Sequence, residues 1–116
     1  MRLIGSKMEK EFREELISSH RHHFSKNSDK KLKSVLLENN YSVDDAYILI
    51  GFPDESEEHY LVLIDGSFIL SVVIEMLYEN VAPVIEHVSL QEYKQGLSRM
   101  KQVQLLVAQN LAGNKT

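Results

Sequence analysis

The amino-acid sequence predicts an α+β domain, in which an antiparallel four-stranded meander sheet follows two N-terminal helices and precedes one long C-terminal helix. Three observations carry this prediction. Apolar side chains recur with helical spacing over residues 8–24 and again over residues 90–111. Between these segments, short apolar runs are separated by turn-forming residues. Among these, Asp65-Gly66 is the strongest hairpin pattern in the chain.

Two helices are expected before the sheet. In residues 8–24, apolar side chains lie three or four positions apart, which is typical of a helix with one buried face. A polar break follows at residues 25–29, where we expect Ser28 to cap a second helix through its side-chain oxygen. This helix ends at Asn39-Asn40, because asparagine tolerates the left-handed conformation of a helix end. Its buried side chains are expected to be Leu32, Val35 and Leu36.

The sheet is expected to begin with two apolar runs, Ala46–Phe52 and His59–Ile64. A charged loop, Pro53–Glu58, separates them, and its proline closes the first run. Asp65-Gly66 then predicts a two-residue type I′ turn, because these residues accept the positive φ angles that such a turn requires.

Alternation of apolar and polar side chains indicates a third strand from Phe68 to Tyr78. One face of this strand is expected to be apolar: Phe68, Leu70, Val72, Ile74, Met76 and Tyr78. The opposite face turns Glu75 and Glu79 toward solvent. A helix through Ile69–Glu79 is the alternative, but the β-branched content and the preceding turn favour the strand.

A short strand and a long helix complete the predicted domain. Val84–Val88 indicates the strand, after a turn at residues 80–83. Ser89 and Glu92 then form a capping box, in which each side chain satisfies a free N–H group of the first helical turn. The helix, which ends at Gly113, carries a stripe with three- and four-residue spacing: Leu90, Tyr93, Leu97, Met100, Gln104, Val107 and Leu111. We expect this stripe to pack against the sheet, with the helices on one face; a coiled-coil seam is the alternative.

The chain of 116 residues has the length of a single domain, so we expect residues 1–116 to fold as one unit, with the order of residues 1–7 left open. The absence of cysteine excludes disulfides, thiolate metal sites and a cysteine nucleophile. The N-terminus lacks the apolar core of a secretion signal, and the apolar stretch of residues 60–78 is interrupted by polar side chains. We therefore expect a cytoplasmic protein without a membrane span.

Charge is divided unevenly along the chain. Residues 1–35 contain nine Lys or Arg and five Asp or Glu, whereas residues 36–116 contain four and twelve. The net charge of −4 thus conceals a surplus of four positive charges in the first segment and of eight negative charges in the second. Such asymmetry indicates that the larger, acidic part attracts a basic partner.

The sequence offers no catalytic or metal-binding motif. His20 and His23 are spaced to share one face of a helix, but no further ligand with metal-site spacing accompanies them. We interpret this histidine-rich segment as a solvated helix end. The serines lie in no nucleophile motif, and the glycines are isolated, so no phosphate-binding loop is expected. These observations predict a protein that is not an enzyme and that has no metal or other cofactor.

A basic patch is expected where the first two helices meet. It consists of Arg21, Lys26, Lys30, Lys31 and Lys33. Because such side chains bind phosphate groups, nucleic acid is an alternative partner. Few aromatic side chains for base stacking lie nearby, and the overall charge is negative, so a solvated helix end is the favoured interpretation.

The acidic segment supplies the candidate binding residues. Carboxylates standing in water speed association with a basic partner. The candidate partner-binding residues are Asp54, Glu55, Glu57, Glu58, Glu75, Glu79, Glu86 and Tyr78. Affinity also requires aromatic or apolar anchors. The aromatic candidates for this role are Tyr41, Tyr47, Phe52, Tyr60 and Tyr78.

The segment Val84-Ile-Glu-His-Val-Ser-Leu-Gln-Glu-Tyr93, a strand that runs into a capped helix, resembles the end of many bacterial immunity proteins. Those proteins neutralise the C-terminal nuclease of a contact-dependent growth inhibition system or a related polymorphic toxin. The resemblance implies a stoichiometric inhibitor, a monomer or weak dimer, whose acidic face covers the basic active site of a cognate toxin. The alternative is a small acidic cytosolic chaperone or adaptor for a secreted protein, which is expected to dimerise.

Overall fold

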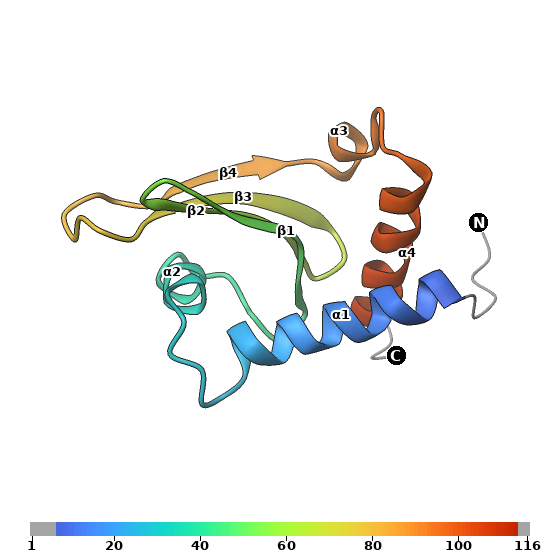
Figure 1. The fold of residues 1–116 in the computed structure, drawn as a ribbon, viewed down its shortest axis with the longest axis horizontal. Helices are drawn as coiled ribbons and strands as arrows, with labels where there is room; N and C mark the ends of the chain where they lie inside the picture. Colours follow the sequence, from blue (N-terminus) through green and yellow to red (C-terminus); the bar gives the residue numbers. More distant parts are fainter. Residues whose placement is uncertain (1–6, 114–116) are drawn as a thin grey trace.

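The computed structural model describes residues 7–113 and has a four-stranded sheet with helices before and after it (Figure 1). In chain order the elements are α1 (Lys7–Phe24), α2 (Lys31–Glu38), β1 (Ala46–Asp54), β2 (Glu57–Ile64), β3 (Phe68–Glu75), β4 (Val84–Val88), α3 (Leu90–Lys94) and α4 (Arg99–Gly113). The sheet is antiparallel with the order β1-β2-β3-β4, which confirms the predicted α+β meander. Residues 1–6 of the segment 1–7 lie outside the described residues.

The two N-terminal helices form as predicted, apart from the cap of α2. Lys30 occupies the N-cap position of α2 and its side chain makes no capping bond. The Ser28 hydroxyl instead donates to the carbonyl of His22 and accepts from the N–H of Lys30, so it closes the turn between the helices. The predicted Ser28 cap is therefore wrong by two residues. Asn40 has a φ of 66°, which confirms that α2 ends in the left-handed conformation.

The first hairpin is longer than predicted. Pro53 pairs with Glu58 and Asp54 pairs with Glu57, so only Glu55 and Ser56 form the turn. The expectation that proline closes the first strand is wrong. Because β1 is at the edge of the sheet, the missing N–H of Pro53 removes no bond that the sheet needs.

The second hairpin turns at Asp65 and Gly66, whose φ angles of 52° and 69° are both positive, as a type I′ turn requires. Three residues rather than two separate the strands, since Ile64 pairs with Phe68. The segment that follows is a strand, which excludes the alternative helix.

The third strand ends earlier than predicted. β3 stops at Glu75 because its partner β2 begins at Glu57, directly opposite, and offers no residue for pairing beyond that point. Met76 and Tyr78, which we expected on the buried face, are exposed in the connection to β4.

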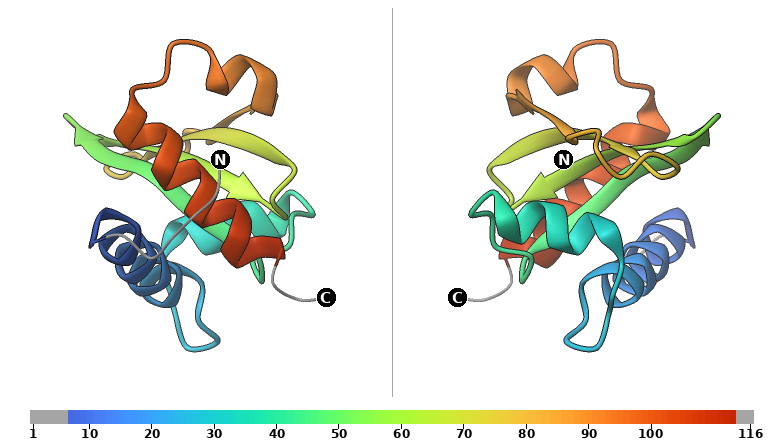
Figure 2. Two further views of the ribbon diagram at one scale, coloured as in Figure 1. Left: turned by 90° about the vertical axis from the view of Figure 1, so that its right-hand side faces the viewer. Right: turned by 90° about the vertical axis from the view of Figure 1, so that its left-hand side faces the viewer.

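Apolar clusters lie on both faces of the sheet, which corrects the expectation of helices on one face. On one face, α2 and the end of α1 pack on even-numbered side chains of β2 and β3. On the other face, α1 and α4 pack on odd-numbered side chains near the second hairpin turn, and α4 crosses this end of the sheet in Figure 2. The strands are apolar on both sides here, as expected for doubly covered strands. Fully buried side chains include Leu36, Val62, Leu70 and Val72 in the first cluster, and Leu63, Ile69 and Val107 in the second.

The predicted long C-terminal helix is broken into α3 and α4. Ser89 caps α3 as expected, accepting a bond from the N–H of Glu92 at 3.1 Å. Gly96 has a φ of 71°, which no right-handed helix contains, and the chain turns there before α4 begins. The predicted stripe is therefore interrupted: Met100 is exposed, while Gln104 is buried and donates from Nε2 to the carbonyl of Leu49. Within residues 7–113, no helix is long and apolar enough to cross a bilayer.

Candidate protein-binding surface

One face of the sheet is uncovered at the end nearest the Glu55-Ser56 turn. α1 and α2 lie beneath the sheet, while α3 and α4 lie at its opposite end (Figure 1). Strand alternation and pairing place three rows of side chains on the uncovered face. From the turn inward, the rows are Asp54–Glu57–Glu75, Phe52–His59–Val73–Val84 and Ile50–Leu61–Ser71–Glu86. We call these residues the open face.

The middle row of the open face joins all four strands with mainly apolar side chains. Phe52 and Val84, at its two ends, are 50% and 52% exposed. The His59 ring stacks on Phe52, with ring centroids 5.0 Å apart and planes 7° from parallel. His59 and Val73, between the two ends, are partly buried, and apolar surface gathered on one face in this way is characteristic of interaction sites.

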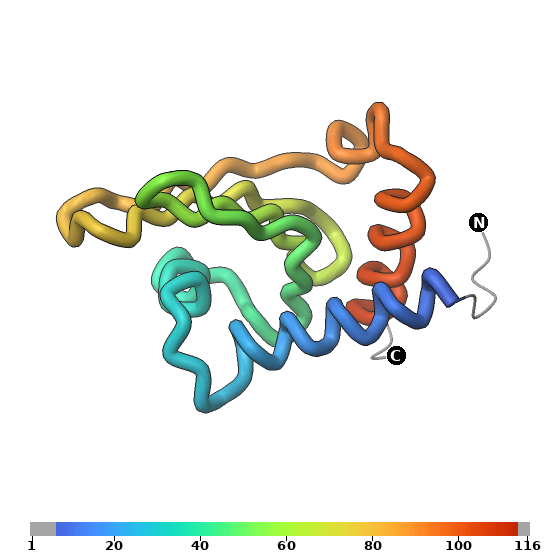
Figure 3. Tube along the Cα trace, viewed as in Figure 1, coloured from blue at the N-terminus to red at the C-terminus, as the bar shows by residue number. Residues whose placement is uncertain are grey.

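The connection from β3 to β4, residues 76–83, projects beyond the sheet beside this row (Figure 3). It adds four exposed apolar or aromatic side chains: Met76, Leu77, Tyr78 and Val81. Between residues 7 and 113, nine large apolar side chains are well exposed, and six of them lie in this connection or in the middle row. Exposed apolar surface is therefore concentrated at one end of the molecule.

The charged side chains of the sheet segment have a single sign. Residues 46–88, which span the whole sheet, contain eight Asp or Glu and no Lys or Arg. The basic side chains of the N-terminal segment belong to α1, α2 and their connection, beneath the sheet. The sequence therefore gives the open face an acidic rim without opposing cations from its own strands.

Six of the eight predicted partner-binding residues are accessible at this end, on the open face, in the adjoining turn or in the projecting connection. Asp54, Glu57 and Glu86 belong to the open face, and Glu55 lies in the adjoining turn. The remaining two, Tyr78 and Glu79, are exposed in the projecting connection.

The other two predicted residues are not exposed on the open face, although Glu75 belongs to its row nearest the turn. Glu58 pairs with Pro53 on the helix side of the sheet and accepts a bond of 2.8 Å from the Tyr60 hydroxyl. Glu75 is 7% exposed, and both of its carboxylate oxygens lie within 2.8 Å of the Ser56 hydroxyl. The expectation that Glu75 faces solvent is wrong, because the first hairpin is tight enough to place Ser56 against it.

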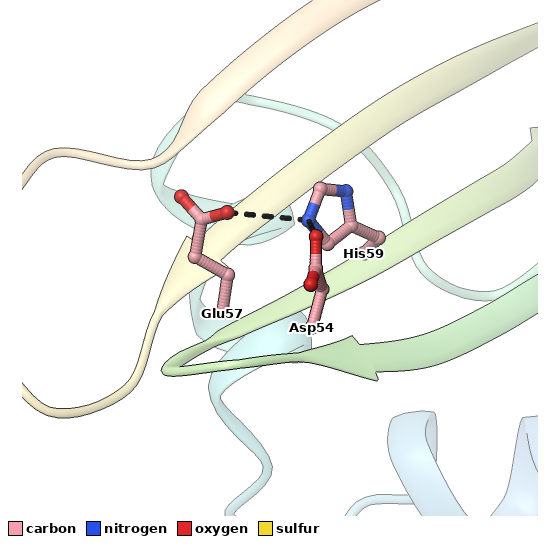
Figure 4. A group of neighbouring side chains, drawn as sticks. All are labelled: Asp54, Glu57 and His59. Carbon is pink, nitrogen blue, oxygen red and sulfur yellow. Dashed lines mark hydrogen bonds and ion pairs between the residues drawn. The ribbon is translucent and has the colours of Figure 1, made fainter.

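Asp54, Glu57 and His59 converge on the open face (Figure 4). His59 Nε2 lies 3.3 Å from Glu57 Oε1 and 3.7 Å from Asp54 Oδ2. One donor atom from each residue lies within 4.8 Å of the other two. Carboxylate oxygen and imidazole nitrogen atoms are common metal ligands, so this group is the candidate metal-binding cluster of the surface.

Part of the N-terminal segment that is rich in histidine and lysine is engaged within the fold, whereas Arg21, His22, Lys26 and Lys30 are exposed, as expected for a solvated helix end. His20 Nδ1 lies 2.6 Å from the carbonyl oxygen of Ala46, and its ring stacks on Tyr47. Lys31 Nζ donates to the carbonyl of Glu75, and Lys33 Nζ donates to carbonyls in the connection between α1 and α2. Lys31 and Lys33, two of the five side chains in the predicted basic patch, therefore form hydrogen bonds within the fold.

A cleft of about 570 Å³ lies between α1, α2 and the free edge of β1. Desolvation raises the pKa of Tyr60, assisted by its hydrogen bond to Glu58. Desolvation, together with the charges of His22 and Lys30, lowers the pKa of His23. Both groups are thus held neutral near pH 7.

Sequence reasoning missed three residues of the middle row: His59, Val73 and Val84. The strand register would have identified them, because residues opposite one another on neighbouring strands share a face. Comparisons of the chain with protein-family models, with curated proteins and with solved structures find no match.

Proposed function

We propose that this chain is a stoichiometric protein-binding inhibitor of the immunity-protein type. It acts in the cytoplasm, and its open face docks on the basic active-site region of a nuclease-like toxin domain. The observation that carries the proposal is the uncovered middle row, Phe52–His59–Val73–Val84, which provides apolar anchors across all four strands. A central apolar cluster within a polar rim is the usual arrangement of protein-binding surfaces.

Charge favours a basic partner over other occupants. The sheet segment contains only carboxylates, and Asp54, Glu57 and Glu86 border the apolar row. A nucleic-acid partner would be repelled by this rim. A second copy of the chain would bring two acidic rims together, and like charges facing each other oppose association. A toxin domain that binds nucleic acid through a basic surface supplies the complementary charge.

The proposal expects a gene next to that of this chain to encode the toxin domain, and the test uses that domain. We expect its nuclease activity to be abolished when the two proteins are mixed in a 1:1 ratio. Phe52→Asp removes an apolar anchor, and loss of such an anchor costs about 2 kcal/mol or more, so binding should weaken by roughly 30-fold. Leu37→Asp is the matched control, because Leu37 is 49% exposed on α2, beneath the sheet.

Two results would contradict the proposal. One is a nuclease that stays active at excess inhibitor. The other is equal loss of inhibition in the Phe52 and Leu37 variants, which would place docking away from the open face. A stable dimer in light scattering that is broken by Phe52→Asp would show that a second copy covers this face, and would favour the chaperone alternative.

A further inference from the structure

We propose that Asp54, Glu57 and His59 form a surface zinc site, with three protein ligands and a fourth coordination position left to solvent or to a partner side chain (Figure 4). This site is independent of the proposed function, since it requires only the isolated chain.

The spacing of the donor atoms fits a single ion. Zinc binds imidazole nitrogen and carboxylate oxygen at roughly 2.0–2.2 Å in a tetrahedral arrangement, which places neighbouring donor atoms about 3.3 Å apart. The two distances from His59 Nε2, 3.3 Å to Glu57 Oε1 and 3.7 Å to Asp54 Oδ2, are close to this value. The carboxylate oxygen atoms of Asp54 and Glu57 lie within 4.8 Å of each other, so side-chain rotation must bring this pair to the same spacing when an ion binds.

The backbone holds the three donors on one face before any ion binds. Asp54 and Glu57 are directly opposite in the β1–β2 pair, next to the two-residue turn, and His59 follows two positions along β2. Stacking on Phe52 fixes the plane of the His59 ring. Ligands fixed in this way lose little conformational entropy when they bind an ion.

The composition of the site selects the class of ion. Calcium and magnesium prefer oxygen ligands alone, whereas zinc accepts nitrogen and oxygen together. The site also contains two carboxylates directly opposite each other on neighbouring strands, an arrangement that is destabilising without a compensating positive charge. A divalent cation supplies that charge.

The histidines of α1 provide the internal comparison. His20 contacts the carbonyl oxygen of Ala46, and His22 is exposed. Among residues 7–113, the Asp54–Glu57–His59 group is the only set of three potential ligands whose donor atoms lie this close together. Zinc binding to the isolated chain should therefore depend on His59 rather than on the histidines of α1.

Isothermal titration of the isolated chain with zinc chloride tests the site. We expect one equivalent to bind. His59→Ala should weaken zinc binding by at least roughly tenfold. Removing a residue that only hydrogen-bonds to a metal ligand already lowers affinity by about this factor, and loss of a ligand itself should cost more. Asp54→Asn and Glu57→Gln should each weaken binding, whereas His22→Ala should leave it unchanged. Circular dichroism of each variant establishes that the fold is retained.

Absence of zinc binding by the wild-type chain would overturn the proposal, as would binding that survives His59→Ala and is lost in His22→Ala. Cobalt substitution gives a second readout, because four-coordinate cobalt has a visible absorption spectrum that an unspecific surface ion lacks. Neither result bears on toxin inhibition, which is measured separately, so the two proposals fail independently.

Discussion

The contact between Ser56 and Glu75 joins the first hairpin turn to the end of β3. The Ser56 hydroxyl lies 2.6 Å and 2.8 Å from the two carboxylate oxygens of Glu75. A backbone hydrogen bond joins the same two segments, since the N–H of Met76 donates to the Ser56 carbonyl at 2.8 Å. Ser56→Ala removes only the hydroxyl and leaves the backbone bond in place.

The expected cost follows from the burial of the carboxylate. A hydrogen bond to a charged group contributes roughly 1.5–3 kcal/mol. Glu75 is 7% exposed, so water cannot fully replace the missing hydroxyl. We therefore expect Ser56→Ala to lower the free energy of unfolding by about 2 kcal/mol. For a domain of this size, that loss lowers the melting temperature by roughly 8 °C.

Thermal and urea unfolding of matched variants measure this cost. Ser67→Ala is the control, because Ser67 is exposed in the other hairpin turn and its hydroxyl donates to a neighbouring carbonyl. We expect this control to change stability by less than about 0.5 kcal/mol. In a Glu75→Gln background, Ser56→Ala should cost less, since the charge is gone. Equal losses in Ser56→Ala and Ser67→Ala would refute the reasoning.

Three further predictions concern the helices. Gly96→Ala forces a side chain into the left-handed conformation and should destabilise the fold by about 1–2 kcal/mol in urea unfolding, whereas Gly113→Ala, at an open site, should have little effect. Gln104→Leu keeps the volume but removes the bond to the Leu49 carbonyl, so we expect a loss of about 1–3 kcal/mol; a gain in stability would contradict this role. The lowered pKa of His23 means that its contribution to stability is complete above pH 6.5 and lost as the pH falls through the folded-state pKa. His23→Gln should reduce that acid sensitivity, as followed by urea unfolding between pH 4 and 8.

Much of the fold could be predicted because local and long-range preferences agree along most of the chain. The Asp65-Gly66 turn, the left-handed end of α2 at Asn40 and the Ser89 cap each depend on the chemistry of one or two residues. The β-branched content of residues 68–75 and the turn before them likewise favoured the strand β3 over a helix.

The errors occur where neighbouring elements override local pattern. Glu75 has the sequence position of a solvent-facing residue, yet its exposure depends on Ser56, which the length of the first hairpin brings close. Glycine in a helix costs about 1 kcal/mol relative to alanine, which is too little to predict that the helix breaks at Gly96. The break also depends on the turn that the chain must make to place α4, and the sequence does not show that turn. The end of β3 depends on where β2 begins, which the sequence of β3 does not contain.

The candidate site was only partly predictable for a related reason. Acidic residues and exposed aromatic residues are visible in the sequence, and most of those proposed lie at one end of the sheet. Their grouping into rows depends on the strand register. A shift of one residue in β1 would move Phe52 and Asp54 to the opposite face, away from Glu57 and His59 of β2.

Lys26, Lys30, Lys31 and Lys33 lie in α2 and the connection before it, beneath the acidic strands, whereas α1 contains four Lys or Arg and four Asp or Glu. This separation of charge makes the molecule an electric dipole, which would orient the basic partner proposed above as it approaches. The molecule extends 32 Å along its second axis, which runs across the sheet and the helices beneath it in Figure 1. Electrostatic fields in salt decay over roughly 8 Å at physiological ionic strength and 30 Å at 0.01 M. An approaching cationic surface therefore senses only the near pole in the cell. In dilute buffer the field of the basic side chains also reaches an approaching cationic surface and repels it. Lowering the salt concentration should therefore accelerate association less than it would if the molecule carried only the acidic charges.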